Sequence, residues 1–252
     1  MKGEVRDRRL ERRPPRSKGR SADDLNFVKL ISHELRGPTT VLRGHLSMWL
    51  EGDGVGFPPE LVPALRSCYG SVLQLNNLIN QMILAVRIHD GALTPAWRPV
   101  DFSKWLRSFA HDSSMVVAST GHGFQLELPR RRLSGRGDTL LLATAIFNLV
   151  DNAQKFSPQN SIIRLAARSE GDRVTIEVID QGHGFPDGFK LEPFARIDRE
   201  LGFERPGVGV GLFIAQGVAR AHGGNLSFIS TATGSTVRLT LPAHEEEAAS
   251  RP

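Results

Sequence analysis

Cysteine, long apolar runs and the common phosphate-binding loop are scarce or absent in this sequence of 252 residues. The single cysteine, Cys68, cannot form an internal disulfide and falls on an apolar position of a predicted helix, so we expect a buried thiol in a reducing cytoplasm. No apolar run approaches the roughly 20 residues that a membrane helix needs, and no signal peptide follows Met1, so we expect a soluble chain without a transmembrane segment. The Gly-x-x-x-x-Gly-Lys loop and the protein serine/threonine kinase motifs are missing, which argues against those classes of ATPase and kinase.

Positive charge is concentrated at the N-terminus. Residues 1–20 contain nine Lys or Arg and three acidic residues, which gives this segment a net charge of +6. Because the whole chain has a net charge of +5, the remaining residues carry −1. With few large apolar side chains this segment is expected to be a disordered tail, as are residues 243–252. A solvated linker explains the basic tail better than a nucleic-acid or membrane contact, and we expect no direct nucleic-acid binding.

The first motif is Ser32-His33-Glu34-Leu35-Arg36-Gly37-Pro38, on a helix expected over residues 22–50. A histidine followed by a carboxylate can be phosphorylated on one ring nitrogen while the acid orients or deprotonates the other. His33 is therefore our candidate phosphoacceptor and Glu34 its assisting group, although a histidine taken alone is more often an ordinary surface residue.

Two apolar seams predict a helical hairpin over residues 21–90, with a loop at 51–59. The seam of the first helix consists of Val28, Ile31, Leu35, Leu42 and Trp49. The seam of the second helix, expected over 60–88, consists of Leu65, Cys68, Val72, Leu75, Ile79, Met82 and Val86. Because two seams alone bury too little surface, we expect a homodimer that forms a four-helix bundle.

Helix breakers at residues 91–99 indicate a linker, and residues 100–242 alternate helix and strand signals. Helices are expected over 102–115, 139–155 and 212–221, and strands over 124–128, 162–168, 174–179, 226–229 and 237–241. Helices mixed with antiparallel strands predict an α+β domain whose helices cover one face of a sheet.

Three groups within this domain fit a nucleotide. Asn148, Asn152 and Lys155 share one stripe of a helix, where amide oxygens suit Mg²⁺ and the ammonium suits phosphate, although a solvated helix face gives the same spacing. Asp180 ends a strand and can accept from an exocyclic amine such as that of adenine. The glycines that allow close approach of backbone to a flat ring or phosphates are Gly182, Gly184, Gly207, Gly209 and Gly211, the last opening a helix at Leu212.

In this order the motifs resemble those of the sensor histidine kinases of two-component systems. Residues 32–40 resemble the H box, 148–157 the N box, 180–184 the G1 box, 192–194 the F box with Phe194, and 207–212 the G2 box. The resemblance covers residues 22–242 and implies a phosphoacceptor hairpin followed by the ATP-binding sandwich of gyrase and Hsp90.

The resemblance implies autophosphorylation of His33 from ATP and Mg²⁺, then transfer to an aspartate of a response regulator. It implies that Asn148 and Asn152 serve the metal, that Lys155 meets the phosphates and that Asp180 meets the adenine. With no input domain in this sequence, the signal is expected from a separate sensor protein or from a longer architecture. Gly37 stands where most relatives carry Thr or Asn, the side chain held to orient water for dephosphorylating the regulator, so we expect weak phosphatase activity.

Two other functions stay open from the sequence. One is a gyrase- or Hsp90-type ATPase that uses nucleotide to drive a conformational change, against which the outward His33-Glu34 pair argues. The other is a catalytically silent dimeric scaffold that binds a regulator, against which the complete set of nucleotide motifs argues.

Overall fold

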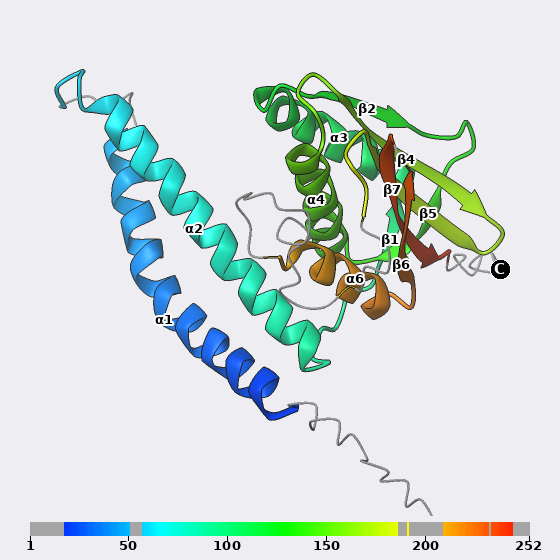
Figure 1. Cartoon of the computed structure of the whole chain (residues 1–252), viewed down its shortest axis with the longest axis horizontal. Coiled ribbons are helices and arrows are strands. Elements are labelled where there is room, and N and C mark those ends of the chain that lie inside the picture. Colours follow the sequence, from blue (N-terminus) through cyan, green and yellow to red (C-terminus); the bar gives the residue numbers. More distant parts are fainter. Residues whose placement is uncertain (1–17, 51–56, 186–190, 192–208, 232, 244–252) are drawn as a thin grey trace, which may run out of the picture.

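A long helical hairpin precedes a domain of helices packed on a sheet (Figure 1). The computed structural model describes residues 18–50, 57–185, 191, 209–231 and 233–243. The hairpin is α1 (Lys18–Leu50) and α2 (Val62–His89), and α1 thus begins inside the stretch expected to be a tail. The α+β class expected from the sequence is confirmed.

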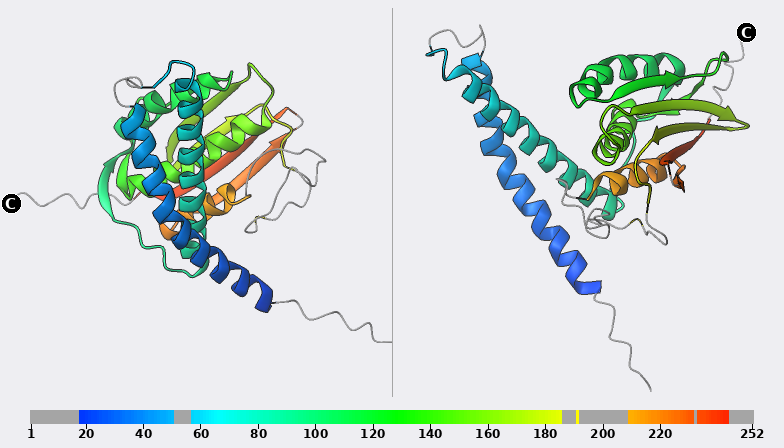
Figure 2. Two further views of the ribbon diagram at one scale, coloured as in Figure 1. Left: turned by 90° about the vertical axis from the view of Figure 1, so that its left-hand side faces the viewer. Right: turned by 45° about the horizontal axis from the view of Figure 1, so that its top comes forward.

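The main sheet has five strands in the order β2-β4-β5-β7-β6. Their bounds are β2 (Gly123–Glu127), β4 (Ile162–Glu170), β5 (Arg173–Asp180), β6 (Asn225–Thr231) and β7 (Gly234–Pro242). Three helices, α3 (Phe102–Ser119), α4 (Thr139–Phe156) and α6 (Gly211–Ala221), cover one face of this sheet (Figure 2). Apolar residues alternate with polar ones along β4 and β7, so one side of each strand joins the core beneath the helices.

The sheet differs from the sequence-based expectation in two ways. A second, two-stranded sheet pairs β1 (Arg98–Asp101) with β3 (Ser134–Gly137), and neither strand was expected. The strand β2 pairs with β4 in parallel, whereas we expected antiparallel neighbours. Both strands of the small sheet are four residues long, so their apolar alternation is too short to read.

Side-chain caps fix where two of the helices begin. Asp138 precedes α4, and its Oδ1 accepts hydrogen bonds from the backbone N–H groups of Leu140 at 3.0 Å and Leu141 at 3.1 Å. Asp101 caps α3 in the same way by accepting from Lys104 N at 3.0 Å. The other carboxylate oxygen of Asp138 accepts from Ala96 N at 3.0 Å, so this cap also ties the linker to the domain.

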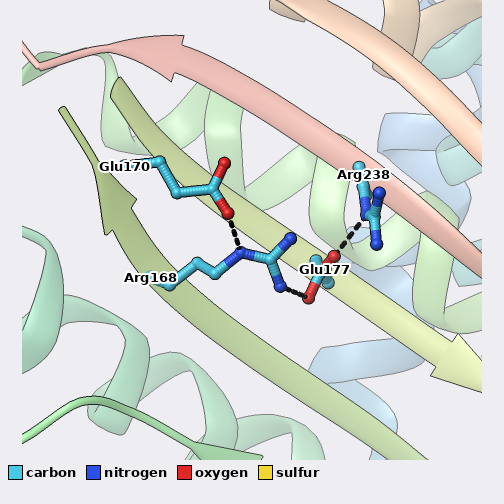
Figure 3. Close-up of polar contacts among 4 residues, drawn as sticks. All are labelled: Arg168, Glu170, Glu177 and Arg238. Atoms are coloured by element: carbon cyan, nitrogen blue, oxygen red, sulfur yellow. Dashed lines mark hydrogen bonds and ion pairs between the residues drawn. The ribbon is translucent and has the colours of Figure 1, made fainter. Parts of the chain in front are cut away.

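The sheet face turned away from the helices carries a charged network (Figure 3). Glu177 is 4% exposed, and its two carboxylate oxygens accept from Arg168 Nη1 at 2.6 Å and from Arg238 Nε. Arg168 also pairs with Glu170. The buried carboxylate is therefore compensated by two guanidinium groups from the neighbouring strands.

The hairpin buries only part of its apolar surface within one chain. Ser32, Thr39 and Leu46, which repeat every seven residues, are the buried α1 side chains among those described. The expected seam residues Ile31, Leu35, Leu42 and Trp49 remain 37 to 51% exposed. Cys68 is exposed as well, so the expectation of a buried thiol is wrong for the single chain.

Candidate nucleotide-binding site

A cavity lies between α4, the end of β5 and the first turn of α6. Its apolar walls are Leu149, Ala153, Phe156, Val178, Phe185, Leu212 and Val237. Its polar lining is Asn152, Asp180, His183 and Ser235, with Gly184 beside them. A mostly apolar space with few, clustered polar groups is typical of a site for a flat organic ligand.

Asp180 is the anionic group of this cavity. Its Oδ1 accepts from Gly182 N at 2.7 Å and from Ser235 N at 3.3 Å, and its Oδ2 accepts from the Ser235 hydroxyl. These bonds fix the carboxylate against the floor formed by β5 and β7. A carboxylate oxygen retains further lone pairs, so Asp180 can accept from the exocyclic amine of a base such as adenine.

Two glycines of the Asp180-Gly184 segment are required by close contacts. A Cβ on Gly182 would lie 2.7 Å from the carbonyl oxygen of Phe156 and 2.9 Å from Asp180 Oδ1. Gly184 has φ +76°, and a Cβ there would lie 1.9 Å from Ser230 Oγ. Only glycine lets the chain turn beside the cavity in this way.

The three predicted polar residues of α4 have different surroundings. Asn152 lines the cavity, as expected. The ammonium of Lys155 pairs with Asp151, one helical turn earlier, and Lys155 is not among the cavity-lining residues. Asn148 is 3% exposed and also lies outside the cavity lining, so the structure does not bring both amides to one surface.

The glycine-rich segment before α6 is described only from residue 209 onward. Gly209 has φ +75°, Gly211 begins α6, and Leu212 lines the cavity. Gly207 and Phe194, which we also expected at the site, lie outside the described residues. The first turn of α6 thus borders the cavity, where its free N–H groups favour an anion.

The predicted phosphoacceptor motif lies on α1, away from this cavity. Glu34 is exposed, and the cavity lining comes entirely from residues 149–237. The backbone of His33 belongs to α1, whereas its side chain is outside the described part of the chain. The structure therefore does not bring the phosphoacceptor motif and the candidate nucleotide site together.

Sequence reasoning missed several residues of the cavity. Ser235 holds both oxygens of Asp180 from a strand 55 residues away, and no local pattern announces that pairing. His183 lies inside the predicted glycine segment and Phe185 directly follows it, so both could have been included on that ground. The His183 ring stands edge-on to Phe156, with 5.3 Å between the ring centroids.

Comparison with protein families agrees with this geometry. Residues 24–91 match the family model described as "His Kinase A (phospho-acceptor) domain". Residues 137–245, which hold the cavity, match the model described as "Histidine kinase-, DNA gyrase B-, and HSP90-like ATPase". The chain belongs to the sensor histidine kinase family. The family resemblance inferred from the sequence is thereby confirmed.

Individual histidine kinases align over most of this chain. The aerobic respiration control sensor protein ArcB of Escherichia coli (strain K12) is 29% identical over 232 residues, which is 88% of this chain and 29% of ArcB. The signal transduction histidine-protein kinase ArlS of Staphylococcus haemolyticus is 24% identical over 204 residues, which is 80% of this chain and 44% of ArlS. The chain thus spans less than half the length of these curated relatives.

Solved histidine kinase structures share the fold. Full-length ShkA, solved in complex with AMPPNP, superposes with a TM-score of 0.70 at 23% identity, covering 88% of this chain and 47% of ShkA. The Acinetobacter baumannii histidine kinase AdeS has a TM-score of 0.58 at 15% identity, covering 84% of this chain and 98% of AdeS. Within the described ranges, no helix combines the length and the apolar character needed to cross a bilayer.

Proposed function

We propose that this chain is an ATP-dependent protein-histidine kinase that phosphorylates its own His33 and passes the phosphoryl group to an aspartate of a response regulator. The observation that carries the proposal is the fixed Asp180 carboxylate in an apolar cavity, on a chain whose hairpin matches a phosphoacceptor domain. Because the donor is ATP, the reaction belongs in the cytoplasm.

The cavity residues divide the nucleotide between them. The apolar walls hold the adenine ring, and Asp180 accepts from its amine. Asn152 also lines the cavity, to which the first turn of α6 contributes Leu212, and its amide oxygen can serve the phosphates. Hard amide oxygens suit Mg²⁺, which neutralises phosphate charge when bound, and among the described residues no cluster of three His, Cys, Asp or Glu offers another metal site.

Transfer requires the hairpin and the nucleotide to come together. A ring nitrogen of His33 forms a bond to the γ-phosphorus as the bond to the bridging oxygen breaks and ADP leaves. Glu34 is placed by sequence to take up or orient the proton of the other ring nitrogen. The ammonium of Lys155 can bind the phosphates after it breaks its ion pair with Asp151.

The exposed hairpin seam supports a homodimer. Leu35, Leu42 and Trp49 on α1 repeat every seven residues and are exposed in the single chain, as are Leu61, which directly precedes α2, and Cys68 and Leu75 on α2. A second copy that covers both rows completes a four-helix bundle. Light scattering should report a dimer for the wild type and a monomer for Leu42→Glu.

The decisive experiment incubates the chain with γ-labelled ATP and Mg²⁺ and compares wild type with His33→Gln. A label that is acid-labile, base-stable and absent from the variant is expected, followed by its transfer to an added receiver domain. ATP binding without any label would contradict the kinase and favour a conformational ATPase or a silent scaffold. A separate sensor protein as the source of the signal is part of the same proposal.

A further inference from the structure

The C-terminal half of α2 packs directly against the ATP-binding domain. Ala85 is 1% exposed and belongs to the same apolar core as α4 and α6, with Leu84 and Ile88 packed against it. Figures 1 and 2 show this half of α2 beside α6. In this arrangement the helical hairpin of α1 and α2, which we call the stem, shares one buried surface with the ATP-binding domain.

A glycine of α6 sets how closely the two parts approach. A Cβ added at Gly217 would lie 2.3 Å from Cγ2 and 2.6 Å from Cδ1 of Ile88. No other group is that close to the added atom, because its three nearest neighbours all belong to Ile88. A substitution at Gly217 therefore strains the contact with the stem in particular.

Seven residues before Ile88, Gln81 of the stem bonds to Asn148, which we predicted to be a metal ligand. Nε2 of Gln81 donates a hydrogen bond of 3.1 Å to Oδ1 of Asn148, and Nδ2 of Asn148 donates to Thr144 O at 2.9 Å. The start of α6 covers the other side, since a Cβ on Gly211 would lie 3.2 Å from the same Oδ1. Both polar atoms of Asn148 are thus engaged, and the side chain is only 3% exposed.

A docked stem is incompatible with a metal role for Asn148. An N–H group aimed at the amide oxygen repels a cation, and a hydrated Mg²⁺ cannot reach an atom buried beneath two helices. The docked stem also holds the phosphoacceptor helix in place, because Arg36 and Thr39 of α1 bond to Asn80 and Asn76 of α2. The cavity meanwhile receives no residue from either stem helix.

We infer that the Gln81–Asn148 bond and the Ile88–Gly217 contact form a docking latch that holds the kinase in a resting state and must open before Mg²⁺-ATP is fully bound. The inference rests on the proposed function for the meaning of the open state. Opening frees the Asn148 oxygen for the metal and, in the same movement, frees the stem to bring His33 to the cavity. Anything that bends α2 can thereby control the nucleotide site.

The test replaces Gln81 with leucine, which has similar size and no donor. The matched control is Gln74→Leu, the same change one heptad earlier at an exposed position of α2. Loss of one hydrogen bond between uncharged groups should shift the docking equilibrium about two- to tenfold. The apparent affinity for Mg²⁺-ATP should rise by about the same factor, because it scales with the population of the open state.

Two readouts are compared on the full chain. Amide hydrogen exchange without nucleotide should be faster in α6 and in residues 81–89 of Gln81→Leu than in wild type, and unchanged in the control. The dissociation constant of a fluorescent ATP analogue with Mg²⁺ should fall in the same variant. Unchanged exchange overturns the latch, and faster exchange with unchanged or weaker nucleotide binding overturns the resting state.

A second pair of variants approaches the latch from the other side. Gly217→Ala should open it as Gln81→Leu does, and the double variant Gly217→Ala with Ile88→Ala should shift it back toward the closed state, because the three atoms nearest to the new Cβ are then gone and the Gln81–Asn148 bond remains. Failure of the double variant to restore slow exchange contradicts the contact. Absence of histidine label even in wild type refutes the proposed kinase, while the exchange readout still decides the latch.

Discussion

The carboxylate of Asp180 is the group on which nucleotide recognition should depend most, and Asp180→Asn isolates its charge. The variant keeps the size and planarity of the side chain. With Oδ1 in place, it still accepts from Gly182 N and Ser235 N. The new amide nitrogen takes the place of Oδ2 and faces the Ser235 hydroxyl, which can rotate to accept. We therefore expect the fold to survive, with a loss of stability of about 1 kcal/mol.

Binding should change far more than stability. A hydrogen bond to a charged group is worth about 1.5 to 3 kcal/mol, and each 1.4 kcal/mol is tenfold in affinity. The replaced oxygen becomes a donor that faces the donor amine of adenine, so the variant loses that bond altogether. We expect ATP to bind about 10- to 150-fold more weakly to Asp180→Asn than to wild type.

Calorimetric titration with ATP, paired with thermal unfolding of each variant, checks this prediction. Asp172→Asn is the matched control, because it is the same substitution at an exposed turn beside the other end of β5. Affinity of Asp180→Asn within threefold of wild type, or an equal loss in the control, would refute the role assigned to the cavity.

Three other predictions follow from the structure. Glu177→Gln should lower the free energy of unfolding by about 2 kcal/mol in urea titrations, because two guanidinium groups lose their shared charge, whereas Glu170→Gln at the exposed end of the network should cost under about 0.5 kcal/mol. Burial lowers the pKa of His222 below 6.5, so at mildly acidic pH the unfolded chain binds a proton there more readily than the folded chain does. The free energy of unfolding should therefore fall as the pH drops below about 6.5. His222→Gln should weaken this pH dependence, whereas His111→Gln at an exposed position should not. Gly37→Thr fits without strain, since nothing lies within 4 Å of an added Cβ, and should raise dephosphorylation of a cognate regulator; a rate equal to wild type would contradict the explanation given for Gly37.

Elements governed by local chemistry could be predicted from the sequence. The helix α4 was expected over 139–155 and runs Thr139–Phe156, because an apolar stripe and an aspartate cap act within a few residues. The strands expected over 162–168 and 174–179 are found as β4 and β5, and the turn between them contains Gly171 at φ +60°. The strands β1 and β3 could not be found this way, since their pairing joins residues more than 30 positions apart.

The site was predictable in its chemistry and less so in its arrangement. Asp180 and Asn152 reached the cavity because a strand end and a helix face fix their directions. Asn148 lies on the same helical stripe as Asn152, yet it meets Gln81 instead of the cavity. Helical angle specifies the direction of a side chain, whereas the neighbour that covers it comes from a helix 67 residues away in sequence.

The hairpin shows what periodicity cannot separate. One apolar seam per helix was expected, but within the chain α1 packs through Ser32, Thr39 and Leu46, a row that contains two hydroxyl side chains. The buried position of Thr39 is tolerated because its hydroxyl hydrogen-bonds to Leu35 O at 2.8 Å and to Asn76 Oδ1 at 3.0 Å. The apolar row of Leu35, Leu42 and Trp49 is therefore the one that stays exposed.

A polar row that is buried within the chain and an apolar row that is exposed are the opposite of what a stable monomeric hairpin requires. Most of the apolar burial would then have to come from association. The same division makes α2 the shared element: one side meets α1, another is exposed and available to the second copy of the proposed homodimer, and its C-terminal half contacts the ATP-binding domain through Gln81. A movement at the proposed dimer interface would thus reach Asn148 through the single helix α2.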